Sequence, residues 1–199
     1  MRHPAAIVAA LLALAASGVA AAPGTSDLAG ACQPALTQAF RPWLDPAWYA
    51  LAPDGGFELG GAGWELGDGA SLGPGNEPWA VSGAGGHVLA LPAGATAWSP
   101  PICIGLLHPT VRLFVRNAAP LGLGLLAVDA EVTAAGVTTT VPVGVVTAGG
   151  RFQPTPPLPL LANVTAPLQG GTGSVRLRFS ALGGSWELDD LYVDPFKTT

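Results

Sequence analysis

Glycine and proline interrupt almost every stretch of this chain, which contains 28 glycines and 20 prolines among 199 residues. Proline breaks a helix interior and glycine weakens it, so long helices are not expected. Such frequent punctuation is typical of many short strands joined by turns. Hydrophobic residues make up 49% of the chain, and they indicate one domain of ordinary size with a core of Leu, Val, Phe and Trp.

Several stretches alternate in the manner of half-buried strands. In residues 110–116, apolar side chains alternate with Arg112, Phe114 and Arg116, the period of a strand with one buried face. We expect about eight or nine strands in an all-β antiparallel β-sandwich. The other expected strands lie within residues 54–64, 76–81, 87–91, 123–132, 137–147, 154–159, 174–179 and 186–194, and residues 65–75 are expected to form a glycine-rich loop.

Residues 1–21 have the features of a secretory signal peptide. A basic start at Arg2 and His3 precedes an apolar run, and small residues stand before a cleavage point after Ala21. A retained N-terminal membrane anchor is the alternative, although the run is short for a bilayer span. No later stretch has the length of a transmembrane helix. We therefore expect a secreted, extracellular protein with no membrane span after signal cleavage.

Residues 22–53 form a proline-rich arm. They carry large apolar side chains such as Trp43 and Trp48, which are too many to leave in water, while five prolines prevent a long regular element. We expect this arm to pack across the domain formed by residues 54–199. Asp45 is expected to cap one helical turn within the arm, with a proline at the first helical position.

The charge balance argues against nucleic acid as a partner. Without the leader, seven basic residues remain against thirteen acidic ones. Lys197 is the single lysine, and the dominance of arginine, alanine, glycine and proline indicates a GC-rich coding sequence, which favours a bacterial source.

Cys32 and Cys103 are the only cysteines. An even pair in an exported chain most simply forms a disulfide, which here would attach the N-terminal arm to the sandwich. The alternative is a catalytic thiol. Neither cysteine lies beside a histidine or in a Cys-x-x-Cys pair, so the disulfide is the better prediction.

Motifs of enzymes are missing from the sequence. It contains no Gly-x-Ser-x-Gly, His-Glu-x-x-His or glycine-rich phosphate loop, and beyond the leader only His87 and His108 are available for triads or zinc sites. Paired carboxylates such as Asp129 and Glu131 could serve a glycosidase, but they fit the solvated face of an alternating strand. We therefore expect a protein that is not an enzyme.

Two stretches resemble the jelly-roll carbohydrate-binding modules and the wider galactose-binding-like fold. Asp54-Gly-Gly-Phe57-Glu58-x-Gly60-x-x-x-Trp64 is similar to their opening, and Leu188-Asp-Asp-Leu-Tyr-Val193 to their last strand. The resemblance covers residues 54–194, with Asp54 replacing the usual Asn and Phe152 standing where a Trp is common. It implies a jelly-roll sandwich, and the arm lies outside it.

In such modules a calcium ion commonly ties the first and last strands, and the resemblance gives that role to Glu58 and Asp189. The residues agree in part. If Leu191 and Val193 face the core, strand alternation places Asp189 on the same side, where an unpaired carboxylate would be costly. Backbone carbonyls of the neighbouring turns could complete the oxygen ligands of a structural calcium. The alternative is that both carboxylates are solvated at the sheet rim or bonded to arginine.

A glycan-binding surface needs an aromatic ring that stacks on a sugar, with polar groups beside it. Trp64 and Trp186 lie in strands of the resemblance and are expected in the core. The remaining tryptophans of the resemblance have polar or proline-rich neighbours, although packing is the alternative role for each. The candidate ligand-binding residues are Trp79, Trp98, Asn76 and Glu77.

Two functions of different classes follow. The first is a secreted, non-catalytic binding module for a glycan, with a structural calcium site. The second is a structural or protein-interaction domain of the cell envelope, which would use the arm or the strand within residues 137–147 as its contact surface. The sequence names neither a particular sugar nor a protein partner.

Overall fold

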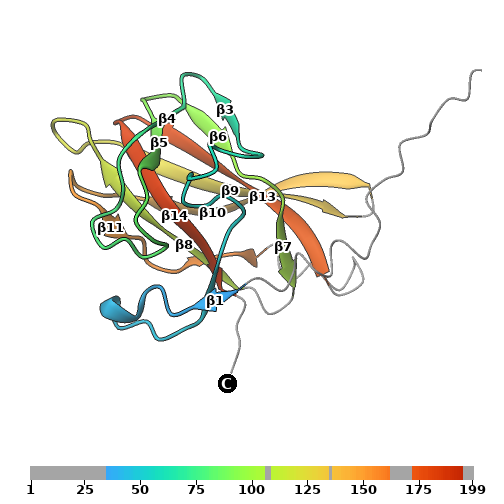
Figure 1. Cartoon of the computed structure of the whole chain (residues 1–199). Helices are drawn as coiled ribbons and strands as arrows, with labels where there is room; N and C mark the ends of the chain where they lie inside the picture. Colours follow the sequence, from blue (N-terminus) through green and yellow to red (C-terminus); the bar gives the residue numbers. More distant parts are fainter. Residues whose placement is uncertain (1–34, 106–108, 135, 162–171, 195–199) are drawn as a thin grey trace, which may run out of the picture.

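The computed structural model describes residues 35–105, 109–134, 136–161 and 172–194. They form an all-β sandwich of two antiparallel sheets with one short 3-10 helix, which confirms the expected fold class (Figure 1). The described residues contain fourteen strands rather than eight or nine, because short strands of two to four residues were not recognisable from sequence periodicity.

The first sheet has eight strands and is called sheet A. Its main order is β1-β2-β14-β5-β4, and β8 pairs with β14 on one side and with β11 and β12 on the other. The strands are β1 (Leu36–Thr37), β2 (Tyr49–Leu51), β4 (Ser71–Pro74), β5 (His87–Leu91), β8 (Thr110–Asn117), β11 (Gln153–Pro154), β12 (Leu158–Pro159) and β14 (Trp186–Asp194).

The second sheet has six strands and is called sheet B. Its order is β10-β9-β13-β6-β3, with β7 paired to β13 beside β6. The strands are β3 (Glu65–Gly67), β6 (Thr96–Trp98), β7 (Ile102–Gly105), β9 (Leu125–Ala134), β10 (Val137–Val146) and β13 (Thr172–Leu182). The hairpin of β9 and β10 lies where the sequence predicted it.

The main core fills the space between the two sheets. Val111, Leu113 and Val115 of β8 point into it, as the alternation of residues 110–116 predicted. Trp64 and Trp186 are also buried there, in agreement with the sequence. These side chains fix the outward direction of their neighbours on β8, and that direction positions an arginine in a surface pocket.

The N-terminal segment lies on the outer side of sheet A, in blue in Figure 1. It adds β1 and β2 to the edge of β14, and between them runs the 3-10 helix η1 (Arg41–Trp43). Phe40 and Tyr49 pack with Phe114 and Tyr192 of the sheet in a second hydrophobic cluster. The helical turn therefore forms around Pro42 rather than after Asp45.

The opening and closing motifs meet at a bulge in β14. Pairing of β14 with β8 shifts between Asp189 and Tyr192, and Asp190 adopts a positive φ of 48°. The backbone of Leu191 exchanges hydrogen bonds with Ala52 and Gly55, at 2.8 and 3.0 Å. A Cβ atom at Gly55 would lie 2.7 Å from the Leu191 carbonyl oxygen, so the close approach requires glycine.

Three local predictions were wrong. Residues 54–64 form turns rather than a strand, because the Asp54 carboxylate accepts hydrogen bonds from the backbone N–H groups of Leu59 and Ala62, at 2.9 and 2.7 Å. Residues 65–75 contain β3 and β4 instead of a loop, and residues 76–81 contain no strand.

Cys103 lies in β7 and is not a free thiol. Cys32 lies outside the described residues, so the Cys32–Cys103 disulfide stays a prediction. The signal peptide of residues 1–21 and part of the arm of residues 22–53 also lie outside the described residues. Among the helices of the described part, none is long and apolar enough to cross a membrane.

Candidate ligand pocket and buried carboxylates

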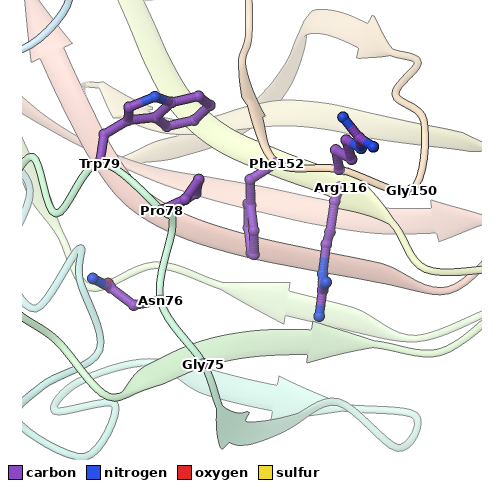
Figure 2. A pocket seen from close by; sticks show the side chains of 8 residues that line it. Gly75, Asn76, Pro78, Trp79, Arg116, Gly150 and Phe152 are labelled. Carbon is purple, nitrogen blue, oxygen red and sulfur yellow. The ribbon is translucent and has the colours of Figure 1, made fainter.

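A pocket of about 380 Å³ opens beside Trp79. Its walls come from Gly75, Asn76, Pro78 and Trp79, which follow β4, from residues 150–152, which precede β11, and from Arg116 of β8 (Figure 2). Arg116 points outward because its neighbour Val115 faces the core and successive side chains alternate between the two faces of a strand. The pocket thus joins three segments that are far apart in the sequence.

Trp79 presents half of its side chain to solvent. It is 47% exposed. Trp43 meets its ring edge to face, with centroids 4.9 Å apart and an interplanar angle of 88°, and the Phe114 ring lies 5.6 Å away. The Trp79 ring is therefore supported by aromatic packing on one side, while it contributes to the pocket on another.

Glu77 does not line the pocket, in contrast to its predicted role in ligand contact. Its side chain is 1% exposed, and its carboxylate accepts hydrogen bonds from the backbone N–H groups of Trp79 and Val81. The N–H of Glu77 itself donates to Asp189 Oδ2 at 2.8 Å. Glu77 therefore holds the turn that carries Trp79 rather than facing a ligand.

Asn76 lines the pocket and is half-buried. Its amide can both donate and accept hydrogen bonds, but in Figure 2 it is directed away from the Phe152 and Arg116 side chains. A Cβ atom at Gly85 would lie 2.9 Å from Asn76 Oδ1, so glycine leaves room for the amide in its present orientation.

Residues that the sequence analysis did not select complete the pocket. The Phe152 ring is half-buried, and the guanidinium carbon of Arg116 lies 5.1 Å from its centroid. Arg116 also forms an ion pair with Glu187, at 2.6 Å between Nη2 and Oε2. Arg151 is exposed at the rim. Alternation in β8 directs Arg116 outward, but no sequence signal shows that residues 150–152 lie opposite Trp79.

Trp98 lies apart from this pocket, in β6 of sheet B. Its side chain is half-buried, and the guanidinium carbons of Arg176 and Arg178 lie 5.6 and 5.4 Å from its ring centroid. Arg178 is in turn paired with Asp129 at 2.8 Å. The ring is therefore engaged by two cations and is less available for stacking than Trp79.

Glu58 and Asp189 have separate partners. Glu58 is near the surface, and its Oε1 accepts hydrogen bonds from the N–H groups of Gly86 and His87, at 2.8 and 2.9 Å. The hydrogen bond from the Gly86 N–H contributes most to holding the pKa of Glu58 below its usual range, burial opposes it, and His87 lowers the pKa further. Glu58 is thus bonded to the backbone where β5 begins, and its role as a calcium ligand stays a prediction.

Asp189 is buried, as the alternation of the last strand predicted. Its two oxygens accept hydrogen bonds from the N–H groups of Glu77 and Asp190, at 2.8 and 2.9 Å. Burial raises the pKa of Asp189 to about 7 because the ionised carboxylate is removed from water, and the charge of Asp190 adds to this effect.

Asp190, the next residue, is the less satisfied carboxylate. Its side chain is buried, and Oδ2 accepts a hydrogen bond from Ser82 N at 2.9 Å, whereas Oδ1 is buried without a hydrogen-bond partner among the described residues. Burial raises the pKa of Asp190, and the charges of Glu77 and Glu58 raise it further. A Cβ atom at Gly56 would lie 3.0 Å from Oδ1, so glycine keeps space beside this oxygen.

The positions of these carboxylates limit how many of them could bind the predicted calcium together. Within residues 35–105, 109–134, 136–161 and 172–194, no group of three or more His, Cys, Asp and Glu side chains is placed to hold a metal ion. Any calcium there would take most of its ligands from backbone carbonyls and water. The unpartnered Asp190 Oδ1 is a donor that fits such a cation, whereas the oxygens of Glu58 and Asp189 already accept hydrogen bonds from backbone N–H groups.

No protein-family model matches the chain, and no curated protein matches it. Solved structures match its fold. The chain aligns with part of a structure of endo-1,4-β-D-xylanase 10B from Clostridium thermocellum that contains the CBM22-1 and GH10 modules complexed with xylohexaose, at 11% identity and a TM-score of 0.52. The alignment covers 71% of this chain and 28% of that chain.

Two further structures show the range of the matches. The C-terminal CBM6 module of the laminarinase LamC from Zobellia galactanivorans aligns at 12% identity and a TM-score of 0.41, over 64% of this chain and 89% of that chain. The K1 cleaved adhesin domain of Lys-gingipain from Porphyromonas gingivalis aligns at 18% identity and a TM-score of 0.44. The alignment covers 67% of this chain and 90% of that chain.

The chain is therefore a jelly-roll β-sandwich of the kind found in carbohydrate-binding modules. At these identities the likeness defines the fold and not the ligand.

Proposed function

We propose that this protein is a secreted, non-catalytic module that binds a glycan in the pocket beside Trp79. The observation that carries the proposal is the half-exposed Trp79 ring, which shares a pocket of about 380 Å³ with Phe152 and Asn76. Aromatic rings stack on the apolar faces of sugars, and a neighbouring amide can bond their hydroxyls.

The structural neighbours support a carbohydrate-binding role in general, but not the particular pocket. They include modules described as carbohydrate-binding, and the xylanase structure with which the fold aligns holds xylohexaose. A binding role, rather than catalysis, is also consistent with Glu77 and Asp189, which are bonded to backbone N–H groups inside the domain. The signal-like residues 1–21 support export.

A glycan array on the mature protein tests this function. The wild type is expected to retain a defined set of glycans, and Trp79→Ala is expected to abolish that retention because the stacking ring is removed. Trp98→Ala is the matched control, since Trp98 lies on the other sheet and does not line the pocket. Melting curves of both variants are recorded alongside the array.

Asn76→Ala provides a second test that leaves the aromatic packing intact. It is expected to fold like the wild type and to bind glycans more weakly, because one hydrogen-bonding group is lost. The proposal would be refuted if the folded wild type retains no glycan on the array, or if both pocket variants bind glycans as tightly as the wild type.

The alternative is a structural or protein-interaction domain of the envelope. One observation favours it: exposed leucines gather where β9 and β13 pair, at Leu125 opposite Leu182, with Leu123 in the preceding loop. This alternative would be supported if the protein binds no glycan on the array and captures an envelope protein, and if Leu123→Ser abolishes that capture.

We also propose that a structural calcium, expected from the family resemblance, is held by Asp190. The support is its buried Oδ1, which accepts no hydrogen bond from the described residues, and its proximity to the charges of Glu77 and Glu58. A divalent cation would relieve this buried negative charge.

A further inference from the structure

We propose that the pocket beside Trp79 selects acidic glycans, whose sugars carry a carboxylate or a sulfate. This inference rests on the proposed glycan-binding function and names its ligand class. It follows from the charges that line the pocket, which differ in sign from the charge of the chain as a whole.

Two arginines and no acidic residue line the pocket. Arg116 and Arg151 are both among its walls, whereas the complete chain has a formal net charge of −5 and contains only eight basic residues. An acidic protein repels anions over most of its surface. A local positive charge next to an exposed tryptophan therefore marks this pocket as the place where an anionic ligand is favoured.

The two arginines differ in their availability. Arg116 is held in place by Glu187, since its Nε and Nη2 lie 2.7 and 2.6 Å from Glu187 Oε2, and it lies over the Phe152 ring. Its charge is largely compensated, so it acts as part of the wall. Arg151 is exposed and has no ion pair or hydrogen bond among the described residues. Arg151 therefore supplies the uncompensated charge.

The chemistry of guanidinium fits such a ligand. Its planar fork can donate two parallel hydrogen bonds to a carboxylate or a sulfate, while the sugar ring stacks on Trp79. Asn76 would bond hydroxyl groups that neutral and acidic sugars share. Discrimination between the two classes would then depend on Arg151, and general affinity on Trp79 and Asn76.

The test compares ligands that differ only in charge. Calorimetric titrations of the mature protein use a hexuronate oligosaccharide, its neutral hexose counterpart of the same linkage, and the sulfated form of that neutral oligosaccharide. The acidic ligands are expected to bind at least about fivefold more tightly, and this advantage should shrink as salt is raised because the contact is near the surface.

Variants assign the effect to one residue. Arg151→Gln is expected to weaken binding of the acidic ligands about fivefold while leaving the neutral ligand unchanged, and Arg151→Lys should recover part of the loss. Arg41→Gln is the control, because Arg41 is also exposed and does not line the pocket. Comparison of carboxylated with sulfated ligands distinguishes the two sources of negative charge.

The outcomes separate this inference from the function on which it rests. Equal binding of neutral and acidic ligands, abolished in Trp79→Ala, would overturn the acidic preference and keep the glycan site. An acidic preference that persists in Arg151→Gln would also overturn the assignment. Binding of none of the three oligosaccharides at any salt concentration would count against glycan binding itself.

Discussion

The guanidinium carbon of Arg112 lies 4.1 Å from the centroid of the Phe40 ring, which joins sheet A to the N-terminal segment. Arg112 also donates from Nε to the Thr155 carbonyl at 2.8 Å and forms an ion pair with Asp45. Its side chain is only 7% exposed, so its charge is compensated inside the protein. The N-terminal segment is thus an integral part of the fold.

Phe40→Ala should destabilise the protein by about 3 to 5 kcal/mol. Phe40 is fully buried and packs against Tyr49, Phe114 and Tyr192, so its loss leaves a cavity under the segment. Denaturant unfolding measures the change. Leu44→Ala is the control, because Leu44 is 94% exposed and should change stability by less than about 0.5 kcal/mol. Equal effects of the two variants would show that the segment contributes little.

Stability should fall at acidic pH through Asp45. Burial opposes ionisation, but hydrogen bonds from Tyr49 and Ala47 and the charge of Arg112 outweigh it and hold the pKa of Asp45 below its usual range. A depressed pKa stabilises the folded state above the unfolded value, and this contribution disappears as pH falls through the folded pKa.

Asp45→Asn should therefore lose about 1 to 2 kcal/mol at neutral pH and show a weaker loss of stability between neutral pH and about pH 2 than the wild type. Unfolding free energies across this range test the prediction. Leu44→Ala, which changes no titratable group at an exposed position, serves as the control and should follow the wild-type curve. If Asp45→Asn loses as much stability as the wild type between neutral pH and about pH 2, Asp45 does not cause the loss of stability in acid.

The regular part of the fold was predictable because its signals are local. The alternation in β8, the hairpin of β9 and β10, and the burial of Asp189 and Trp186 each follow from neighbouring residues. The strand count was too low because β3 and β4 take their stability from pairing with β6 and β5, which a glycine-rich sequence does not reveal.

The pocket was only partly predictable. Trp79 and Asn76 could be selected from composition, but Arg116 and Phe152 are brought to them by pairing of β8 with β14 and β11. The burial of Glu77 was missed because its partners are N–H groups of a turn, and such backbone geometry leaves no pattern in the side chains.

Glu77→Gln tests the role of that buried carboxylate. An amide keeps one acceptor oxygen, so one of the N–H groups of Trp79 and Val81 should lose its partner. We expect a loss of about 1 to 3 kcal/mol and faster amide exchange at both positions. Glu65→Gln, at an exposed position, is the control. Unchanged exchange at Trp79 would mean that Glu77 does not hold the turn.

The predicted disulfide between Cys32 and Cys103 needs a chemical test, because Cys32 lies outside the described residues. Peptide mass spectrometry of the secreted protein, alkylated without reductant, should recover Cys32 joined to Cys103. On the chain-entropy model this closure contributes about 4 kcal/mol, so reduction should lower the melting temperature. Recovery of two alkylated cysteines from freshly secreted protein would contradict the pairing.

The calcium proposal makes its prediction at Asp190. Protein stripped of metal should melt at a lower temperature than protein with calcium, because binding to the folded state alone stabilises it by about 2.7 kcal/mol at roughly 100 times the dissociation constant. Asp190→Asn should remove this difference.

Asp190→Asn should also raise the melting temperature of the metal-free protein at neutral pH, since a buried charge with an unpartnered oxygen is replaced by a neutral amide. Glu58→Gln distinguishes calcium bound by Asp190 from calcium bound by Glu58 and Asp189. If Asp190 is the main ligand, this variant keeps most of the stabilisation by calcium. Identical melting curves with calcium and with chelator, in wild type and in Asp190→Asn, would show that Asp190 is a buried carboxylate without a cation.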